Sequence, residues 1–164
     1  MKKILLVGKT GQVGDMMREQ ADAFGFSVVG FSKEEFDITN HTQMQDGIER
    51  VKPDILINTA AYHVMGECEK NPLIAMNINS LAVARLASLC KAHAIRFVTY
   101  STDYVFNGET KNPYHEESEP MPLQIYGMSK CAGEYAAVAR YPEGSYIIRT
   151  CGVYGGISGS RSKK

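Results

Sequence analysis

Two residues four apart, Tyr126 and Lys130, have side chains that together could move a proton. In a helix this spacing puts both side chains on one face, a turn apart. An ammonium near a phenol favours the phenolate and so lowers the tyrosine pKa from its ordinary value of about 10. Such a tyrosine can donate a proton to a carbonyl oxygen or accept one from an alcohol. The same spacing also fits an aromatic helix anchor beside a solvated lysine, so the surrounding elements must decide.

A glycine-rich segment at 8–14, Gly-Lys-Thr-Gly-Gln-Val-Gly, follows an apolar run and opens a helical pattern. Glycines let the backbone turn tightly and approach a pyrophosphate, which the N–H groups at the helix N-terminus then stabilise. The spacing differs from Gly-x-Gly-x-x-Gly but meets the same needs, and it is not a Walker loop. The segment predicts a nucleotide site, with a purely structural turn as the alternative.

Short apolar runs alternate with longer helical patterns along the chain. Strands are expected at 3–7, 27–31, 54–58, 95–100 and 145–149, and helices at 10–24, 41–51, 71–92 and 126–140. Apolar strands separated by helices indicate a parallel sheet with helices on both faces, a Rossmann-type doubly wound α/β fold. Ligands bind such sheets at the carboxyl ends of the strands.

The chain divides into one domain and a short tail. We expect an NAD(P)-binding domain that carries the catalytic residues over 1–156, and a flexible or truncated tail at 157–164. The segment 107–122 holds three prolines and several acidic residues, which predicts a long ordered loop over a cleft.

Composition argues against several classes of function. Eighteen basic and eighteen acidic residues cancel, so no net charge attracts the chain to nucleic acid or a membrane surface. The apolar run at 4–7 is too short for a secretory signal or a membrane span. Four scattered cysteines and four scattered histidines form neither a metal-ligand pattern nor a disulfide framework. We therefore expect a cytoplasmic protein with reduced thiols and no bound metal.

Small and hydroxyl-bearing residues end two of the expected strands. The segment 58–62, Asn-Thr-Ala-Ala-Tyr, suits close packing against a cofactor, although a small-residue turn would look the same. Ser101 and Thr102 could hydrogen-bond a substrate carbonyl, or simply cap the strand. In a parallel sheet these hydroxyls reach the same cleft as Tyr126.

The end of the second strand bears on the choice of coenzyme. No acidic residue stands at its tip to bind a ribose 2′-hydroxyl, and Ser32 and Lys33 would tolerate a 2′-phosphate. Glu34 and Glu35 follow at once and could reverse that preference. NADPH is favoured, and NADH stays open.

Taken together, these segments resemble the extended short-chain dehydrogenase/reductase superfamily, and within it the dTDP-4-dehydrorhamnose reductase branch. The resemblance rests on the segments 8–14, 52–62, 101–108, 123–134 and 148–155. It runs along nearly the whole chain, and Ser-Thr-Asp-Tyr-Val-Phe at 101–106 is fairly specific to the branch. Members of the branch are much longer, so the C-terminal substrate domain is expected to be largely absent.

The resemblance implies a catalytic group of Thr102, Tyr126 and Lys130. Tyr126 would protonate the C4 oxygen of a nucleotide-linked 4-keto-6-deoxysugar while NADPH or NADH delivers hydride to C4. Lys130 would hold the nicotinamide ribose, and Thr102 would orient the keto oxygen.

The resemblance also implies a set of cofactor-binding residues. Besides Tyr126 and Lys130 these are Gly8, Gly11, Gln12, Val13, Asp37, Ile38, Ala60, Ala61, Tyr62 and Asn79. Asp37 could equally cap a helix, and Asn79 could be an ordinary helix side chain.

The implied function is NAD(P)H-dependent reduction of a dTDP-linked 4-keto-deoxysugar for deoxysugar and cell-surface polysaccharide biosynthesis. A homodimer through the helices at 71–92 and 126–140 would follow the superfamily, and a chain of this length could bind coenzyme yet turn over nothing. The segment 63–68 departs from the branch and leaves the sugar undetermined. Two alternatives remain, a non-catalytic regulatory subunit of the methionine adenosyltransferase beta type and a nucleotide-sugar epimerase.

Overall fold

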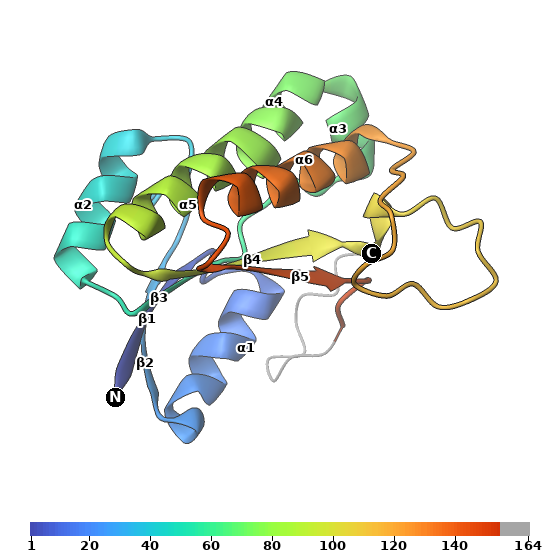
Figure 1. Ribbon diagram of the computed structural model, residues 1–164. Coiled ribbons are helices and arrows are strands. Elements are labelled where there is room, and N and C mark those ends of the chain that lie inside the picture. Colours follow the sequence, from blue (N-terminus) through green and yellow to red (C-terminus); the bar gives the residue numbers. More distant parts are fainter. Residues whose placement is uncertain (155–164) are drawn as a thin grey trace.

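A single parallel sheet organises the computed structural model, which describes residues 1–154 (Figure 1). Its five strands are β1 (Lys2–Val7), β2 (Phe26–Phe31), β3 (Ile55–Asn58), β4 (Arg96–Thr102) and β5 (Ser145–Thr150), in the order β2-β1-β3-β4-β5. All neighbouring strands are parallel, and Val7 at the end of β1 pairs with both Phe31 and Asn58. The carboxyl ends therefore meet at one edge, which confirms the predicted doubly wound fold.

Helices cover the two faces of the sheet unequally. They are α1 (Gln12–Gln20), α2 (His41–Val51), α3 (Met65–Lys70), α4 (Pro72–Met76), α5 (Ala82–Ala92) and α6 (Ile125–Arg140). Three short turns complete them: η1 (Ala21–Phe24), η2 (Asn77–Leu81) and η3 (Asp103–Val105). In Figure 1, α1 lies below the sheet and the other helices lie above it.

The hydrophobic core lies on the side of α2, α5 and α6. Alternate strand residues such as Leu5, Leu56 and Phe97 are fully buried there against Ile48 and Leu86. This alternation follows from the period of two along a strand, which directs every second side chain to the same face.

The expected helix at 71–92 consists of three segments. Pro72 opens α4, where its missing N–H costs nothing, and α5 follows after the π-helical turn η2. Within residues 1–154, Pro72–Ala92 is the one stretch long and apolar enough to cross a membrane. Val83, Leu86 and Cys90 from this stretch are buried in the protein core, which accounts for its apolar composition.

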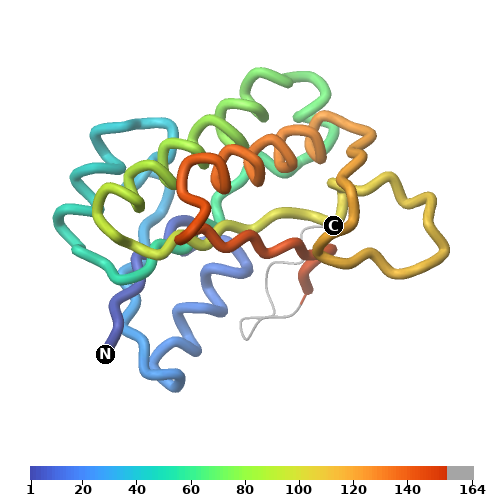
Figure 2. Tube along the Cα trace, in the orientation of Figure 1, coloured from blue at the N-terminus to red at the C-terminus, as the bar shows by residue number. Residues whose placement is uncertain are grey.

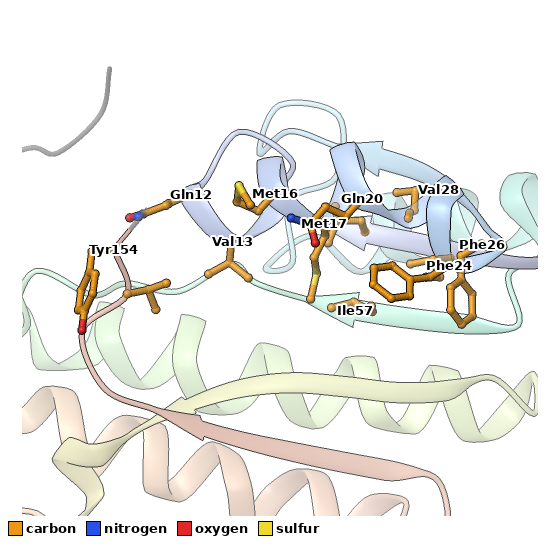
Figure 3. Close-up of a pocket in the computed structure, with 14 residues that line it drawn as sticks. Gln12, Val13, Met16, Met17, Gln20, Phe24, Phe26, Val28, Ile57 and Tyr154 are labelled. Atoms are coloured by element: carbon orange, nitrogen blue, oxygen red, sulfur yellow. The ribbon is translucent and has the colours of Figure 1, made fainter. Parts of the chain in front are cut away.

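The opposite face carries apolar side chains that the described residues leave partly open. A groove of about 510 Å³ beside α1 is lined by Met16, Met17, Phe24 and Ile57, among others (Figure 3). Further along the same face, Tyr146 and Ile148 of β5 are exposed. The α1 side of the sheet is therefore less covered than the α5 side.

The predicted loop at 107–122 has no helix or strand. In the trace of Figure 2 it projects beyond the sheet, between η3 and α6. The predicted tail at 157–164, with the last two residues of the predicted domain, lies outside the described residues.

Candidate active site

Thr102 and Tyr126 come together where β4 ends and α6 begins. A Cβ on Gly127 would lie 2.1 Å from the carbonyl oxygen of Tyr104, so only glycine lets the first turn of α6 pack this closely on η3. The rings of Tyr104 and Tyr126 meet edge to face, with centroids 6.0 Å apart. This packing holds the Tyr126 hydroxyl beside the Thr102 side chain.

The surroundings of Tyr126 keep its hydroxyl protonated. Burial raises the pKa of Tyr126 above its ordinary value of 10, and a hydrogen bond with the Thr102 side chain opposes this rise. A phenol with a raised pKa holds its proton at neutral pH and can act as an acid. The sequence predicted that Lys130 lowers this pKa, and the structure differs because the Lys130 ammonium is bound elsewhere.

Lys130 is buried one turn further along α6, with 5% of its surface exposed. Its Nζ donates a hydrogen bond to the carbonyl oxygen of Tyr100 on β4 at 2.5 Å. Burial lowers the pKa of Lys130 to about 8, and the Glu134 carboxylate opposes the shift. The ammonium therefore changes charge close to neutral pH.

The glycine loop joins β1 to α1, the position at which a doubly wound sheet binds a pyrophosphate. Gly8 has a φ of 89°, and a Cβ on Gly14 would lie 2.3 Å from the Gly8 carbonyl oxygen, so both glycines are required by the fold. Gly11 is different, because a Cβ there would meet only the same oxygen at 3.4 Å. Gly11 is also the N-cap of α1 and offers no side chain to its first turn. Gln12 and Val13 begin that turn, so the predicted phosphate-binding residues lie together.

The loop after β3 lies next to this glycine loop. Thr59 Oγ1 donates a hydrogen bond to the Val7 carbonyl oxygen at 2.8 Å. Asn58 is 1% exposed, and its side chain accepts a hydrogen bond from Ala60 N at 3.1 Å. These bonds bring Ala60, Ala61 and Tyr62 to the carboxyl ends of the strands.

Asn79 links that loop to α6. Its Oδ1 accepts from Tyr62 N at 2.8 Å, while its Nδ2 donates to Tyr62 O at 2.8 Å and to Ser129 Oγ at 2.9 Å. Ser129 Oγ in turn donates to the Tyr126 carbonyl oxygen at 2.8 Å. Asn79 is 2% exposed, so these bonds are shielded from water.

Ser129 was not among the predicted site residues. Its position between Tyr126 and Lys130, one turn from Tyr126, is the sequence signal that could have identified it.

Asp37 and Ile38 follow β2, where the structure gives each a local role. Asp37 Oδ1 accepts hydrogen bonds from Thr39 N and Thr39 Oγ1 at 2.8 and 2.7 Å, and Ile38 is buried in the core. Asn40, not Asp37, caps α2 with its side chain. Contact between Asp37 or Ile38 and a cofactor stays a prediction.

Ser101 places an unused hydroxyl at the end of β4. Its Oγ is buried and has no hydrogen-bond partner within residues 1–154. A buried polar atom without a partner is uncommon in native structures.

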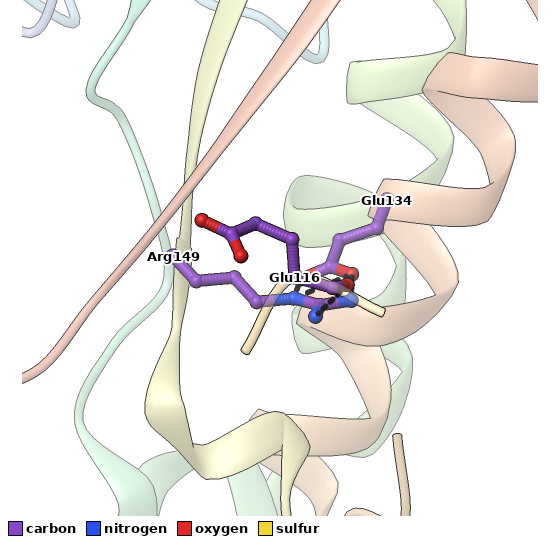
Figure 4. A network of polar contacts seen from close by, with 3 residues as sticks. All are labelled: Glu116, Glu134 and Arg149. Carbon is purple, nitrogen blue, oxygen red and sulfur yellow. Dashed lines mark hydrogen bonds and ion pairs between the residues drawn. The ribbon is translucent and has the colours of Figure 1, made fainter. Parts of the chain in front are cut away.

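An ion pair fixes the long loop to the outer edge of the site. Arg149 of β5 lies within 2.6 Å of Glu134 Oε2 on α6, and its Nη1 donates to the Glu116 carbonyl oxygen at 3.3 Å (Figure 4). The Arg149 guanidinium also lies over the Phe106 ring, 5.1 Å from its centroid, and this ring stacks on Tyr114. The start and the middle of the loop are therefore anchored to Arg149 of β5, which the ion pair joins to α6.

Known proteins are similar to this chain in sequence and in fold. The family model described as the RmlD substrate binding domain matches residues 1–163. The dTDP-4-dehydrorhamnose reductase of Salmonella typhimurium is 34% identical over 163 residues, covering 98% of this chain and 54% of the relative. The spore coat polysaccharide biosynthesis protein SpsK of Bacillus subtilis is 34% identical over 155 residues, covering 94% of this chain and 54% of the relative.

A solved structure gives the same result. The dTDP-4-dehydrorhamnose reductase of Bacillus anthracis, in complex with NADP, superposes with a TM-score of 0.87 at 32% identity, covering 92% of this chain and 53% of that one. The chain thus spans about half the length of the relatives it matches. From the match to the family model over 163 of its residues, the chain belongs to the RmlD substrate binding domain family.

Proposed function

We propose that the chain is the coenzyme-binding and catalytic part of an NADPH- or NADH-dependent reductase. The substrate would be a dTDP-linked 4-keto-6-deoxysugar, reduced at C4. The observation that carries this proposal is the meeting of Thr102, Tyr126 and Lys130 at the carboxyl end of β4, on the same edge of the sheet as the glycine loop.

The described residues suit the coenzyme. Gly11 presents no side chain at the N-terminus of α1, where a pyrophosphate would bind, and Tyr62 would pack near the nicotinamide half. The Bacillus anthracis relative, which holds NADP, supports this assignment. When bound, the reduced coenzyme supplies a hydride.

Three side chains would supply the proton, the orientation of the C4 oxygen and a positive charge. Tyr126, whose phenol is protonated at neutral pH and whose pKa burial raises further, donates its proton to the C4 oxygen as that oxygen gains charge. Thr102 Oγ1, which interacts with Asp103 Oδ1 at 3.1 Å, lies beside Tyr126 and orients the same oxygen. The Lys130 ammonium is held by its hydrogen bond to the Tyr100 carbonyl oxygen, and it places a positive charge beneath the site.

The names of the relatives support the substrate. The Salmonella and Bacillus anthracis proteins are named as reductases of dTDP-4-dehydrorhamnose, and SpsK is named for polysaccharide biosynthesis. We therefore place the reaction in deoxysugar supply for cell-surface polysaccharides, in the cytoplasm.

The outer faces of two neighbouring helices support a homodimer. The apolar side chains of Leu73 and Leu81 near α4, and of Tyr135 and Val138 on α6, are exposed by 83, 53, 63 and 45%. Burying such side chains against a second copy would be favourable.

The proposal is tested in a version of the protein extended to the full length of its relatives, which is mixed with NADPH and dTDP-4-dehydrorhamnose while the loss of the reduced nicotinamide is followed. Tyr126→Phe should lower the rate by about a hundredfold to ten-thousandfold, because the proton donor is removed. Coenzyme affinity should change little. Reduction of the sugar at equal, measurable rates by the two proteins would exclude Tyr126 as the proton donor.

A further inference from the structure

A salt bridge joins the glycine loop to the turn that follows β2. Lys9 Nζ lies 2.6 Å from Glu35 Oε2, and the same oxygen accepts a hydrogen bond from Ser32 N at 2.7 Å. Phe36 N donates to the Ser32 carbonyl oxygen at 3.0 Å and closes the turn. Glu35 therefore lies beside the tip of β2, although four positions separate it from the last residue of that strand.

Packing contacts hold Lys9 in place in addition to its salt bridge with Glu35. Lys9 N donates to the Phe31 carbonyl oxygen at 3.0 Å. The stem of Lys9 crosses Gly30, where a Cβ would lie 2.9 Å from Lys9 Cβ. Arg18 reaches the same glycine, with its Cδ 3.2 Å from that Cβ position. The end of β2 is therefore flanked by fixed cationic stems and by the Glu35 carboxylate.

This place matters because of where a dinucleotide lies on such a sheet. The adenosine ribose lies at the tip of the second strand, where an acidic residue accepts the 2′-hydroxyl of NAD and a cation accommodates the 2′-phosphate of NADP. Lys9 and Glu35 are 27% and 48% exposed, so both can reach a ligand. The hydrogen bond from Lys9, with that from Ser32, lowers the pKa of Glu35 to about 2.

We propose that the Lys9–Glu35 pair sets the coenzyme preference of this chain and favours NADH. Glu35 accepts a hydrogen bond from the ribose 2′-hydroxyl, neutralises Lys9 and repels a 2′-phosphate. The inference rests on the proposed function, since it requires a nicotinamide coenzyme on the glycine loop. It reverses the preference for NADPH that Ser32 and Lys33 suggested.

Three variants isolate the pair. Glu35→Gln keeps the side-chain shape and frees the Lys9 ammonium, and the double variant with Lys9→Met then removes that ammonium while keeping an apolar stem. Glu34→Gln is the matched control, because it removes a carboxylate from the same turn that interacts with Ser32 and not with Lys9. Dissociation constants for NADH and NADPH are measured by titration for each protein.

The unmodified chain should bind NADH more tightly than NADPH. Glu35→Gln should shift the ratio of the two constants toward NADPH by about tenfold, since a repulsion is lost and an attraction is gained. The double variant should lose most of that shift, and Glu34→Gln should show a much smaller one.

Other results would overturn the inference. The pair would have no role in coenzyme preference if Glu35→Gln left the ratio of the NADH and NADPH dissociation constants unchanged. The same would follow if the unmodified chain already preferred NADPH. Either result would leave the proposed function standing. Failure of the unmodified chain to bind either coenzyme would overturn both.

Discussion

Lys130 Nζ lies 2.5 Å from the carbonyl oxygen of Tyr100, so a buried ammonium bonds helix α6 directly to strand β4. A carbonyl oxygen is a neutral partner and recovers only part of the hydration that the ammonium loses on burial. Lys130 therefore has a pKa of about 8, well below its ordinary value of 10.5. The burial that places this charge under the site also makes the charge sensitive to pH.

The pH dependence of stability should report this buried lysine. Between pH 8 and 10.5 the unfolded chain keeps the Lys130 proton while the folded protein releases it. The free energy of unfolding therefore increases as the pH rises through this range. Lys130→Met removes this contribution. The difference in unfolding free energy, native minus variant, should therefore rise across that range, by at most about 1.4 kcal/mol per pH unit.

The Lys130 effect is checked by urea unfolding at several pH values. Lys91→Met removes an ammonium whose side chain is 51% exposed and gives the baseline. Equal slopes for the two variants would contradict the assignment.

Two glycines of the same loop should respond differently to alanine. Gly14→Ala places a Cβ 2.3 Å from the Gly8 carbonyl oxygen and should cost about 1–3 kcal/mol of stability, because α1 must move away. Gly11→Ala makes only an ordinary contact at 3.4 Å and should leave the melting temperature nearly unchanged. Calorimetry compares them, and similar losses for both would show that Gly11 is also required by the fold.

Asn79 should matter through the backbone of Tyr62. Asn79→Leu leaves the Tyr62 N–H and C=O without their partner and should cost about 1–3 kcal/mol for each. Ser129→Ala removes one bond to Asn79 and keeps those to Tyr62, so it should cost less. Asn77→Leu, in the same π-helical turn, is the control for urea unfolding. If Asn77→Leu lowers the free energy of unfolding as much as Asn79→Leu does, the loss comes from disturbing the π-helical turn and not from the bonds to Tyr62.

Arg149 should stabilise both the sheet edge and the long loop. Arg149→Met leaves the Glu134 carboxylate, 8% exposed, without its partner and should destabilise the protein by up to about 3 kcal/mol. Replacing Glu134 by Gln in the same protein should recover part of the loss, because the buried charge is removed. Proteolysis within 106–124 should become faster in Arg149→Met, since Arg149 contacts Phe106 and the Glu116 carbonyl. Unchanged cleavage would mean that the loop is held by other contacts.

Local signals predicted most of the fold. The helix at 41–51 has the bounds that the sequence indicated, because Asn40 caps it and Lys52 ends it in a left-handed conformation. Helix α3 was missed, since six residues are too few for an apolar period to show. The π-helical turn at 77–81 was missed because one widened turn barely changes the spacing of apolar residues.

The site was predictable where its residues are close in sequence. The glycine loop and the Tyr126–Lys130 pair each lie within one turn or loop, so their spacing alone was enough to make them candidates. The contacts of Asn79 with Tyr62 and of Lys9 with Glu35 join separate elements, and only the folded sheet brings them together. The Lys130 pKa likewise could not be predicted from the sequence, because it depends on burial against β4.

Coenzyme binding tests the central claim most directly. Titration of the chain with NADH and with NADPH, followed by heat, is compared with the same titration of Gly11→Val, whose side chain would fill the space at the start of α1. The account predicts saturable binding by the unmodified chain and at least about a tenfold loss of affinity in the variant. No saturable binding, or equal affinities for the two proteins, would contradict it.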